Sequence, residues 1–132
     1  MTAPYRLRPF AWPHPDPPGS LHLRVRHPVP SIAVVEANGE IDLATAPHLA
    51  DVVEARLRSA VGLVVIDLRG TTFLAVAGLH TLHRLHLRAQ TADADLYVDP
   101  GASRIVRRLL DLFPLSCERP GAADLALRQD PR

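Results

Sequence analysis

Lysine is missing from this chain, although fifteen of its 132 residues are basic and all of these are arginine. A phosphate-binding loop of the Walker type and a Schiff-base site both need a lysine, so the sequence excludes both kinds of site. Cys117 is the only cysteine, which excludes an intrachain disulfide and a multi-cysteine metal site. We expect Cys117 to be a small buried or half-buried residue.

Long apolar runs and a strong net charge are also absent. No apolar stretch approaches the roughly 18 residues needed to cross a bilayer, and prolines interrupt the N-terminus where a signal peptide would need an apolar segment. We therefore expect a cytoplasmic protein that does not contact a membrane. A net charge of +1 argues against a general nucleic-acid-binding surface.

The chain has room for one domain with a core, and its composition changes at both ends. Residues 1–20 hold six of the thirteen prolines, so we expect a disordered tail there. We expect a single α/β domain over residues 21–120. Residues 121–132 are expected to form a weak helix and a frayed C-terminal tail.

The periodicity of the apolar residues predicts a mixed sheet of about four to five strands with helices packed on it. Alternating apolar residues over 21–26 and an apolar run over 32–37 predict a hairpin. Thr45 is expected to cap the first helix, and residues 69–72 to form a loop. The remaining expected elements are strands over 63–68 and 94–99, helices over 78–89, 104–113 and 121–128, and a short last strand over 115–118.

Four stretches of the chain resemble the STAS domain family of anti-sigma factor antagonists. These stretches are Gly39-Glu40-Ile41-Asp42-Leu43-Ala44-Thr45-Ala46, Val64-Val65-Ile66-Asp67-Leu68 with Thr71-Thr72-Phe73 after it, Gly78-Leu79 with Leu82, and Leu96-Tyr97-Val98-Asp99-Pro100. Their order and spacing cover about residues 21–117. The resemblance implies a STAS-like fold and a function in protein binding.

The resemblance fails at the family's phosphorylation motif. Antagonists of the family carry approximately [VIL]-D-S-[ST]-G before the second helix, and a kinase phosphorylates the first serine. Here the same positions are Leu74-Ala75-Val76-Ala77-Gly78, so that only the glycine is kept. Because Val76 has no oxygen to accept a phosphate, the resemblance implies that this position is not phosphorylated.

The change matters because of where the serine would stand. A phosphate at the start of a helix lies beside free backbone N–H groups and the positive end of the helix dipole. Phosphorylation would add about −1.5 to −2 charges there and repel or reposition a partner. We therefore expect a partner-binding surface that a kinase cannot switch.

The resemblance implies a protein partner, namely an anti-sigma factor of the kinase fold. The partner-binding residues carried over from it are Asp42, Thr45, Ala75, Val76, Ala77, Gly78 and Leu79. For Asp42 a second interpretation has equal weight, in which its side chain only caps the turn into the first helix. Without a phosphorylation switch, the domain would be a constitutive antagonist, a scaffold, or a relic that kept only the fold. The alternative function is an accessory or sensor module, either associated with a transporter or binding a small ligand.

No residue pattern predicts catalysis, a cofactor or a metal site. We find no paired carboxylates, no nucleophile with a base and no glycine-rich phosphate loop. His80, His83 and His86 drift around their helix without a nearby carboxylate, which favours a solvated face over a metal site. Arg104, Arg107 and Arg108 are likewise expected to form a solvated face. We therefore expect a protein that is not an enzyme and has no cofactor.

Overall fold

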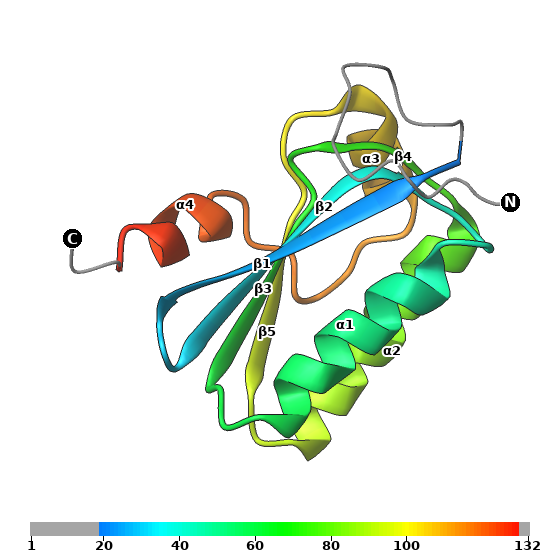
Figure 1. The fold of residues 1–132 in the computed structure, drawn as a ribbon. Helices are drawn as coiled ribbons and strands as arrows, with labels where there is room; N and C mark the ends of the chain where they lie inside the picture. The colour runs from blue at the N-terminus through cyan, green and yellow to red at the C-terminus, as the bar shows by residue number, and fades with distance from the viewer. Residues whose placement is uncertain (1–18, 130–132) are drawn as a thin grey trace, which may run out of the picture.

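The computed structural model of the protein describes residues 19–129, and the expectations for residues 1–18 and 130–132 lie outside the described residues. A five-stranded sheet has four of its strands in the order β1-β2-β3-β5, and the fifth, β4, pairs with β2 (Figure 1). The elements in chain order are β1 (Leu21–Val29), β2 (Ile32–Ile41), α1 (Ala46–Arg58), β3 (Leu63–Asp67), β4 (Thr71–Leu74), α2 (Val76–Thr91), β5 (Asp95–Asp99), α3 (Arg104–Leu112) and α4 (Ala122–Leu127). The expected α/β architecture with a mixed sheet is confirmed.

The pairing of the strands follows from their connections. β1 and β2 form the predicted hairpin, which is antiparallel, with Leu23 opposite Ala37 and Val25 opposite Val35. The helical crossovers make β2, β3 and β5 parallel, as strand–helix–strand units require. β3 is nearly continuous in apolar residues because helices cover both of its faces.

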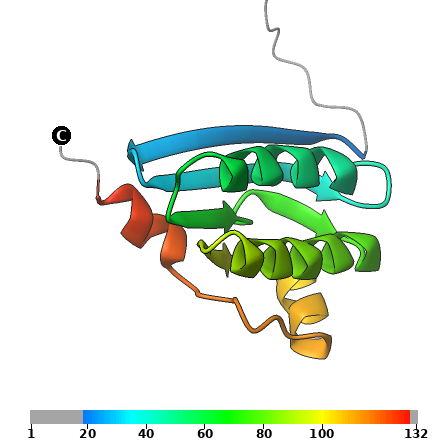
Figure 2. The same ribbon diagram turned by 90° about the horizontal axis from the view of Figure 1, so that it is seen from below.

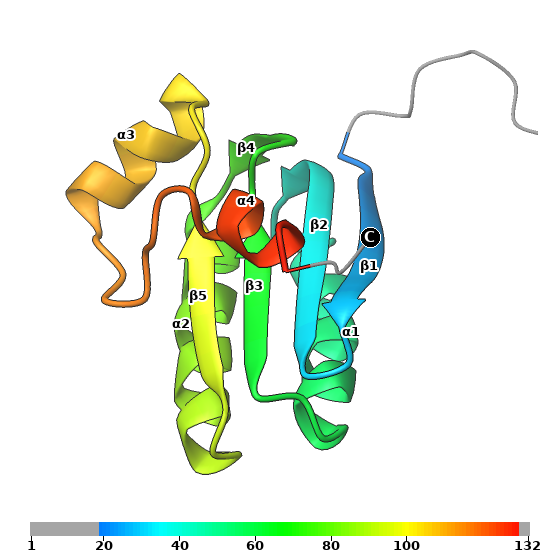
Figure 3. The same cartoon turned by 90° about the vertical axis from the view of Figure 1, so that its left-hand side faces the viewer.

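The helices lie on opposite sides of the sheet. α1 and α2 run side by side along one face and bury the larger core, which includes Leu49, Ile66 and Leu82 (Figure 2). α4 covers part of the other face, where its alanines pack on Val34 and Val65 (Figure 3). α3 lies beyond the carboxyl ends of the strands, near β4. Ser103 caps α3, since its hydroxyl accepts a hydrogen bond from the Val106 N–H at 3.5 Å.

Three expectations about the strands were wrong. Residues 71 and 72, expected in a loop, begin β4, which pairs in parallel with the end of β2. β2 itself continues four residues past its expected end at Ala37 because β4 provides that partner. The expected last strand over 115–118 is reduced to one isolated bridge between Val98 and Glu118. In each case a long-range pairing, which local periodicity does not encode, decided the outcome.

Within residues 19–129 no helix has the length and apolar character needed to cross a membrane. The division of the chain into a tail, a domain and a C-terminal segment stays a prediction. Helix α4 of that C-terminal segment lies against the sheet, where Ala122, Ala123 and Ala126 are buried.

Candidate functional site

The loop between β2 and α1 is held by the side chain of Asp42. Its Oδ1 accepts hydrogen bonds from the backbone N–H groups of Ala44 and Thr45, each at 3.0 Å. Asparagine and aspartate form such turns readily because the short side chain reaches the backbone two or three residues on. Through Oδ1, the side chain of Asp42 therefore caps the turn into the first helix, as the second interpretation expects. Partner binding by this residue stays a prediction.

Thr45 occupies the N-cap position of α1 but closes the loop instead of capping the helix. Its hydroxyl donates to the Glu40 carbonyl at 2.7 Å and accepts from the Asp42 N–H at 2.9 Å. No side-chain cap bond reaches the first turn of α1. The expectation that Thr45 stands at the start of α1 holds, and its expected capping bond does not form, because the hydroxyl bonds back to β2.

β4 brings the start of α2 against the Asp42 loop. Leu74 is in register with Ile41, and the Ala75 N–H donates to the Ile41 carbonyl at 2.8 Å. Ala75 is the N-cap residue of α2, with an extended backbone and no side-chain cap. The two segments that the sequence singled out are therefore neighbours in space.

The residues at the start of α2 differ in exposure. Val76 is 49% exposed, whereas Ala75 and Ala77 are half-buried. Gly78 and Leu79 are buried, so they hold the helix in place and offer little surface. A Cβ on Gly78 would lie 2.7 Å from side-chain atoms of both Ile41 and Leu74, so only glycine allows α2 to approach the sheet this closely.

A groove of about 480 Å³ lies between the first turns of α1 and α2, beside the Asp42 loop. Leu43 at the tip of the loop is 79% exposed and lines the groove. The other lining residues are Ala46, Pro47, Ala77, His80, Thr81, His83 and Arg84. The groove therefore brings an exposed leucine, a half-buried alanine and basic groups together on one concave surface.

Sequence reasoning missed Leu43 and the groove. A leucine between two motif residues is not unusual, and which faces of two helices meet depends on tertiary packing. His80 and His83 are exposed on α2, as expected for a solvated helix face. In the described part of the chain, no group of three or more histidine, cysteine or acidic residues is placed to hold a metal ion.

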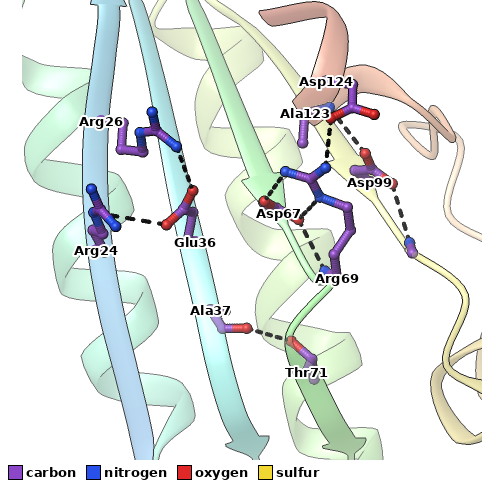
Figure 4. A network of polar contacts seen from close by, with 11 residues as sticks. Arg24, Arg26, Glu36, Ala37, Asp67, Arg69, Thr71, Asp99, Ala123 and Asp124 are labelled. Atoms are coloured by element: carbon purple, nitrogen blue, oxygen red, sulfur yellow. Dashed lines mark hydrogen bonds and ion pairs between the residues drawn. The ribbon is translucent and has the colours of Figure 1, made fainter. Parts of the chain in front are cut away.

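A polar cluster at the carboxyl ends of β3 and β5 serves the fold (Figure 4). Arg69 binds buried Asp67 through Nε and Nη2 at 3.0 and 2.9 Å, and it reaches Asp124 of α4 at 2.7 Å. Hydrogen bonding to Asp67 raises the pKa of Arg69 above its ordinary value. Asp99 accepts from the N–H groups of Gly101 and Ala123. Asp67 is therefore held at the end of β3 by the backbone N–H and the guanidinium of Arg69.

Cys117 is buried, as expected, and lies next to the bridge between Val98 and Glu118. Burial raises the pKa of its thiol to about 11, so the thiol stays protonated at neutral pH. A protonated, inaccessible thiol is a poor nucleophile.

The comparisons with known proteins agree with this fold. The family model described as Mlab, STAS domain, matches residues 29–116. A solved anti-sigma factor antagonist from Mycobacterium paratuberculosis is 27% identical, with a TM-score of 0.70 over 88% of this chain and 98% of that one. A comparison with curated proteins gives no match.

Two more distant structures share the fold alone. The Bacillus cell fate determinant SpoIIAA in its phosphorylated form is 11% identical, with a TM-score of 0.64 over 82% of this chain and 98% of that one. The murine anion transporter Slc26a9 is 13% identical, with a TM-score of 0.62 over 79% of this chain and 18% of the transporter. The fold therefore occurs both as a complete small protein and as part of a much larger one.

Proposed function

Since this chain belongs to the STAS domain family, we propose that it is a non-catalytic domain that binds a kinase-fold anti-sigma factor and is not switched by serine phosphorylation. Its role would then be the regulation of transcription in the bacterial cytoplasm. The likeness to the mycobacterial anti-sigma factor antagonist, which extends over most of both chains, supports the class of partner.

The observation that carries the proposal is the exposure of Val76. The side chain is 49% exposed at the first residue of α2, beside the Asp42 loop. A serine there would offer its hydroxyl to a kinase and, once phosphorylated, would repel or reposition the partner. Valine keeps the surface accessible but has no acceptor oxygen. The partner-binding surface therefore stays in one chemical state.

The surface around Val76 has the features of a small binding site. Leu43 and Val76 supply exposed apolar area, and the groove between α1 and α2 is concave. Arg84 at the groove donates to the Thr81 hydroxyl at 3.1 Å and can also meet an acidic group of a partner. We expect Leu43 and Val76 to contribute to the binding free energy, because a partner would remove their exposed apolar surface from water.

The test is a binding and phosphorylation assay against the kinase-fold anti-sigma factors of the source organism. We expect the native chain to bind one of them and to receive no phosphate from ATP. The variant Val76→Glu should weaken binding by about tenfold or more, because it buries a carboxylate in the interface. Leu125→Glu is the matched control and should leave binding unchanged, because this exposed residue belongs to α4, which packs on the opposite face of the sheet.

A companion variant tests the lost switch directly. Ala75→Asp combined with Val76→Ser restores the aspartate and the acceptor serine of the motif and leaves Ala77 unchanged. Phosphate transfer to this variant would show that only the acceptor chemistry is missing. If neither the native chain nor the variant binds any kinase-fold anti-sigma factor, the proposed function is wrong.

A second candidate is a non-switching module of another complex, such as a transporter. The occurrence of this fold within Slc26a9 makes that class reasonable on architectural grounds only. The same native surface would then hold a different protein. Co-purification of a transporter subunit, lost in Val76→Glu and kept in Leu125→Glu, would favour this candidate over the anti-sigma factor.

A further inference from the structure

A second groove lies on the opposite face of the sheet, between α4 and the strands β3 and β5. Its volume is about 340 Å³, within the range of roughly 300–1,000 Å³ that small-molecule sites span. Figure 3 shows this face, with α4 in front of the strands. The lining residues are Ile32, Leu63, Val65, Tyr97, Arg119, Pro120, Ala122, Leu125, Ala126 and Gln129.

The floor of the groove is apolar. Val65 and Tyr97 are in register on neighbouring strands, and Leu63 is in register with Ile32 on the other side. These positions share one face of the sheet because successive side chains alternate between faces. The wall is α4, where the small side chain of Ala126 lies next to Leu125, which is 61% exposed. An apolar ligand here would cover surface that the protein leaves in contact with water.

The wall of the groove is positioned without a ligand. Asp99 Oδ2 accepts a hydrogen bond from the Ala123 N–H at 3.0 Å, and Arg69 holds Asp124 at 2.7 Å (Figure 4). Both contacts tie the start of α4 to the carboxyl ends of the strands. A preformed groove spares a ligand the entropic cost of ordering the wall.

One cation stands at the rim. The guanidinium of Arg119 lies over the ring of Tyr97, 5.0 Å from its centroid, and its Nη1 donates to the Glu118 carbonyl at 2.8 Å. These contacts hold the guanidinium in place while engaging only part of its five N–H donors. No carboxylate is among the described residues that line the groove. Among the described residues, the groove therefore pairs an apolar floor with a rim cation that no lining carboxylate neutralises.

We propose that this groove binds a fatty acid of medium chain length, with its carboxylate at Arg119 and its alkyl chain along Leu63, Val65 and Leu125. A carboxylate can accept two N–H bonds from a guanidinium, and a linear chain suits a groove bounded by strands on one side and a helix on the other. The proposal goes beyond the partner surface, which lies on the other face of the sheet. Its failure would leave the proposed function untouched.

Calorimetric titration of the full chain with decanoate, below the concentration at which decanoate forms micelles, tests the proposal. We expect saturable binding, with affinity rising about fourfold for each added methylene from octanoate to decanoate. In ¹H–¹⁵N spectra the shifted amides should be those of Val65, Tyr97 and α4. Absence of binding at millimolar decanoate, including the case where another part of the chain fills the groove, overturns the proposal.

Two variants assign the roles. Arg119→Gln should weaken decanoate binding by about tenfold while leaving decan-1-ol binding unchanged, because only the carboxylate uses the cation. Arg108→Gln on α3 is the matched control and should have no effect. Leu125→Asp, at an exposed position that folding tolerates, should abolish decanoate binding by placing a like charge in the groove. Equal binding of decanoate and decylammonium, or amide shifts confined to the α1–α2 groove, would contradict the proposal.

Discussion

Buried polar side chains show how single residues determine the local geometry. Asp67, Thr71 and Asp99 are nearly inaccessible to solvent, and each has a hydrogen-bond partner. Thr71 donates to the Ala37 carbonyl at 2.8 Å, which joins β4 to β2 where the two strands begin to pair. A buried polar atom without a partner costs about 1–3 kcal/mol. Because any other strand ending would leave these side chains unpaired, they help to specify where the strands end and turn.

The thiol of Cys117 gives a prediction at the residue scale. Because burial raises its pKa to about 11 from 9.0, the folded state holds the proton more tightly than the unfolded chain. The resulting stabilisation is fully present below pH 9 and is lost as the pH rises through 11. A shift of this size corresponds to about 2–3 kcal/mol.

The measurement compares the native chain with Cys117→Ala by urea unfolding at several pH values. The difference in the free energy of unfolding between the two proteins should change by about 2–3 kcal/mol, to the disadvantage of the native chain, between pH 8.5 and 11.5. The alanine variant controls for tyrosine and arginine residues, which both proteins share. A difference that stays constant over this range would contradict the prediction.

At the scale of elements, the packing of α2 on the sheet is the feature on which the partner surface depends. Gly78 lets the first turn of α2 approach Ile41 and Leu74. This contact fixes the position of Val76 relative to the Asp42 loop. The exposed residues at the start of α2 therefore owe their position to a buried glycine beneath them.

We predict that Gly78→Ala destabilises the protein by about 1–3 kcal/mol, because the added methyl group overlaps two side chains and a backbone carbonyl. Gly62→Ala is the matched control. Its methyl group would have only the Ser31 carbonyl near it, at 3.9 Å, so this variant should be close to neutral. Thermal and urea unfolding measure both. Equal stability of the two variants would show that α2 does not depend on this close approach.

At the scale of the whole molecule, the sheet supports two surfaces of different character. One face carries the large core beneath α1 and α2, and the other carries a small cluster of Val34, Val65 and the alanines of α4. Since α4 has only six residues and little buried apolar area, its position on the sheet depends on the hydrogen bonds at its N-terminal end. Those bonds come from Asp99 and Arg69, which link α4 to the strand ends.

We predict that Asp99→Ala releases α4 more than it weakens the sheet. The variant leaves the Ala123 N–H without its partner. Relative to the native chain, amide hydrogen exchange should therefore accelerate in α4 by at least about tenfold more than in β3. Asp124→Ala removes the other bond at the start of α4, the exposed ion pair with Arg69, and should cost at most about 1 kcal/mol, with a smaller increase in exchange in α4 than Asp99→Ala causes. Faster exchange throughout β2 and β3 with unchanged exchange in α4 would contradict this account.

Local patterns in the sequence determined most of the elements. The run Leu63–Asp67 is a strand because it is apolar throughout, and α3 starts after Ser103 because serine caps helices. The order of the motifs also predicted the α/β fold. The resemblance to the STAS family placed Asp42 and Val76 in one candidate site, whose use by a partner stays a prediction.

Tertiary structure decided what depends on contacts between distant residues. β4 has four residues and exists because β2 pairs with it, and Thr45 bonds back to Glu40 because the loop folds over β2. The exposed position of Leu43 and the groove between α1 and α2 follow from how two helices meet. The groove at α4 follows from the face of the sheet on which that helix packs. Each of these is set by free energies of long-range packing, which the periodicity of a single segment does not contain.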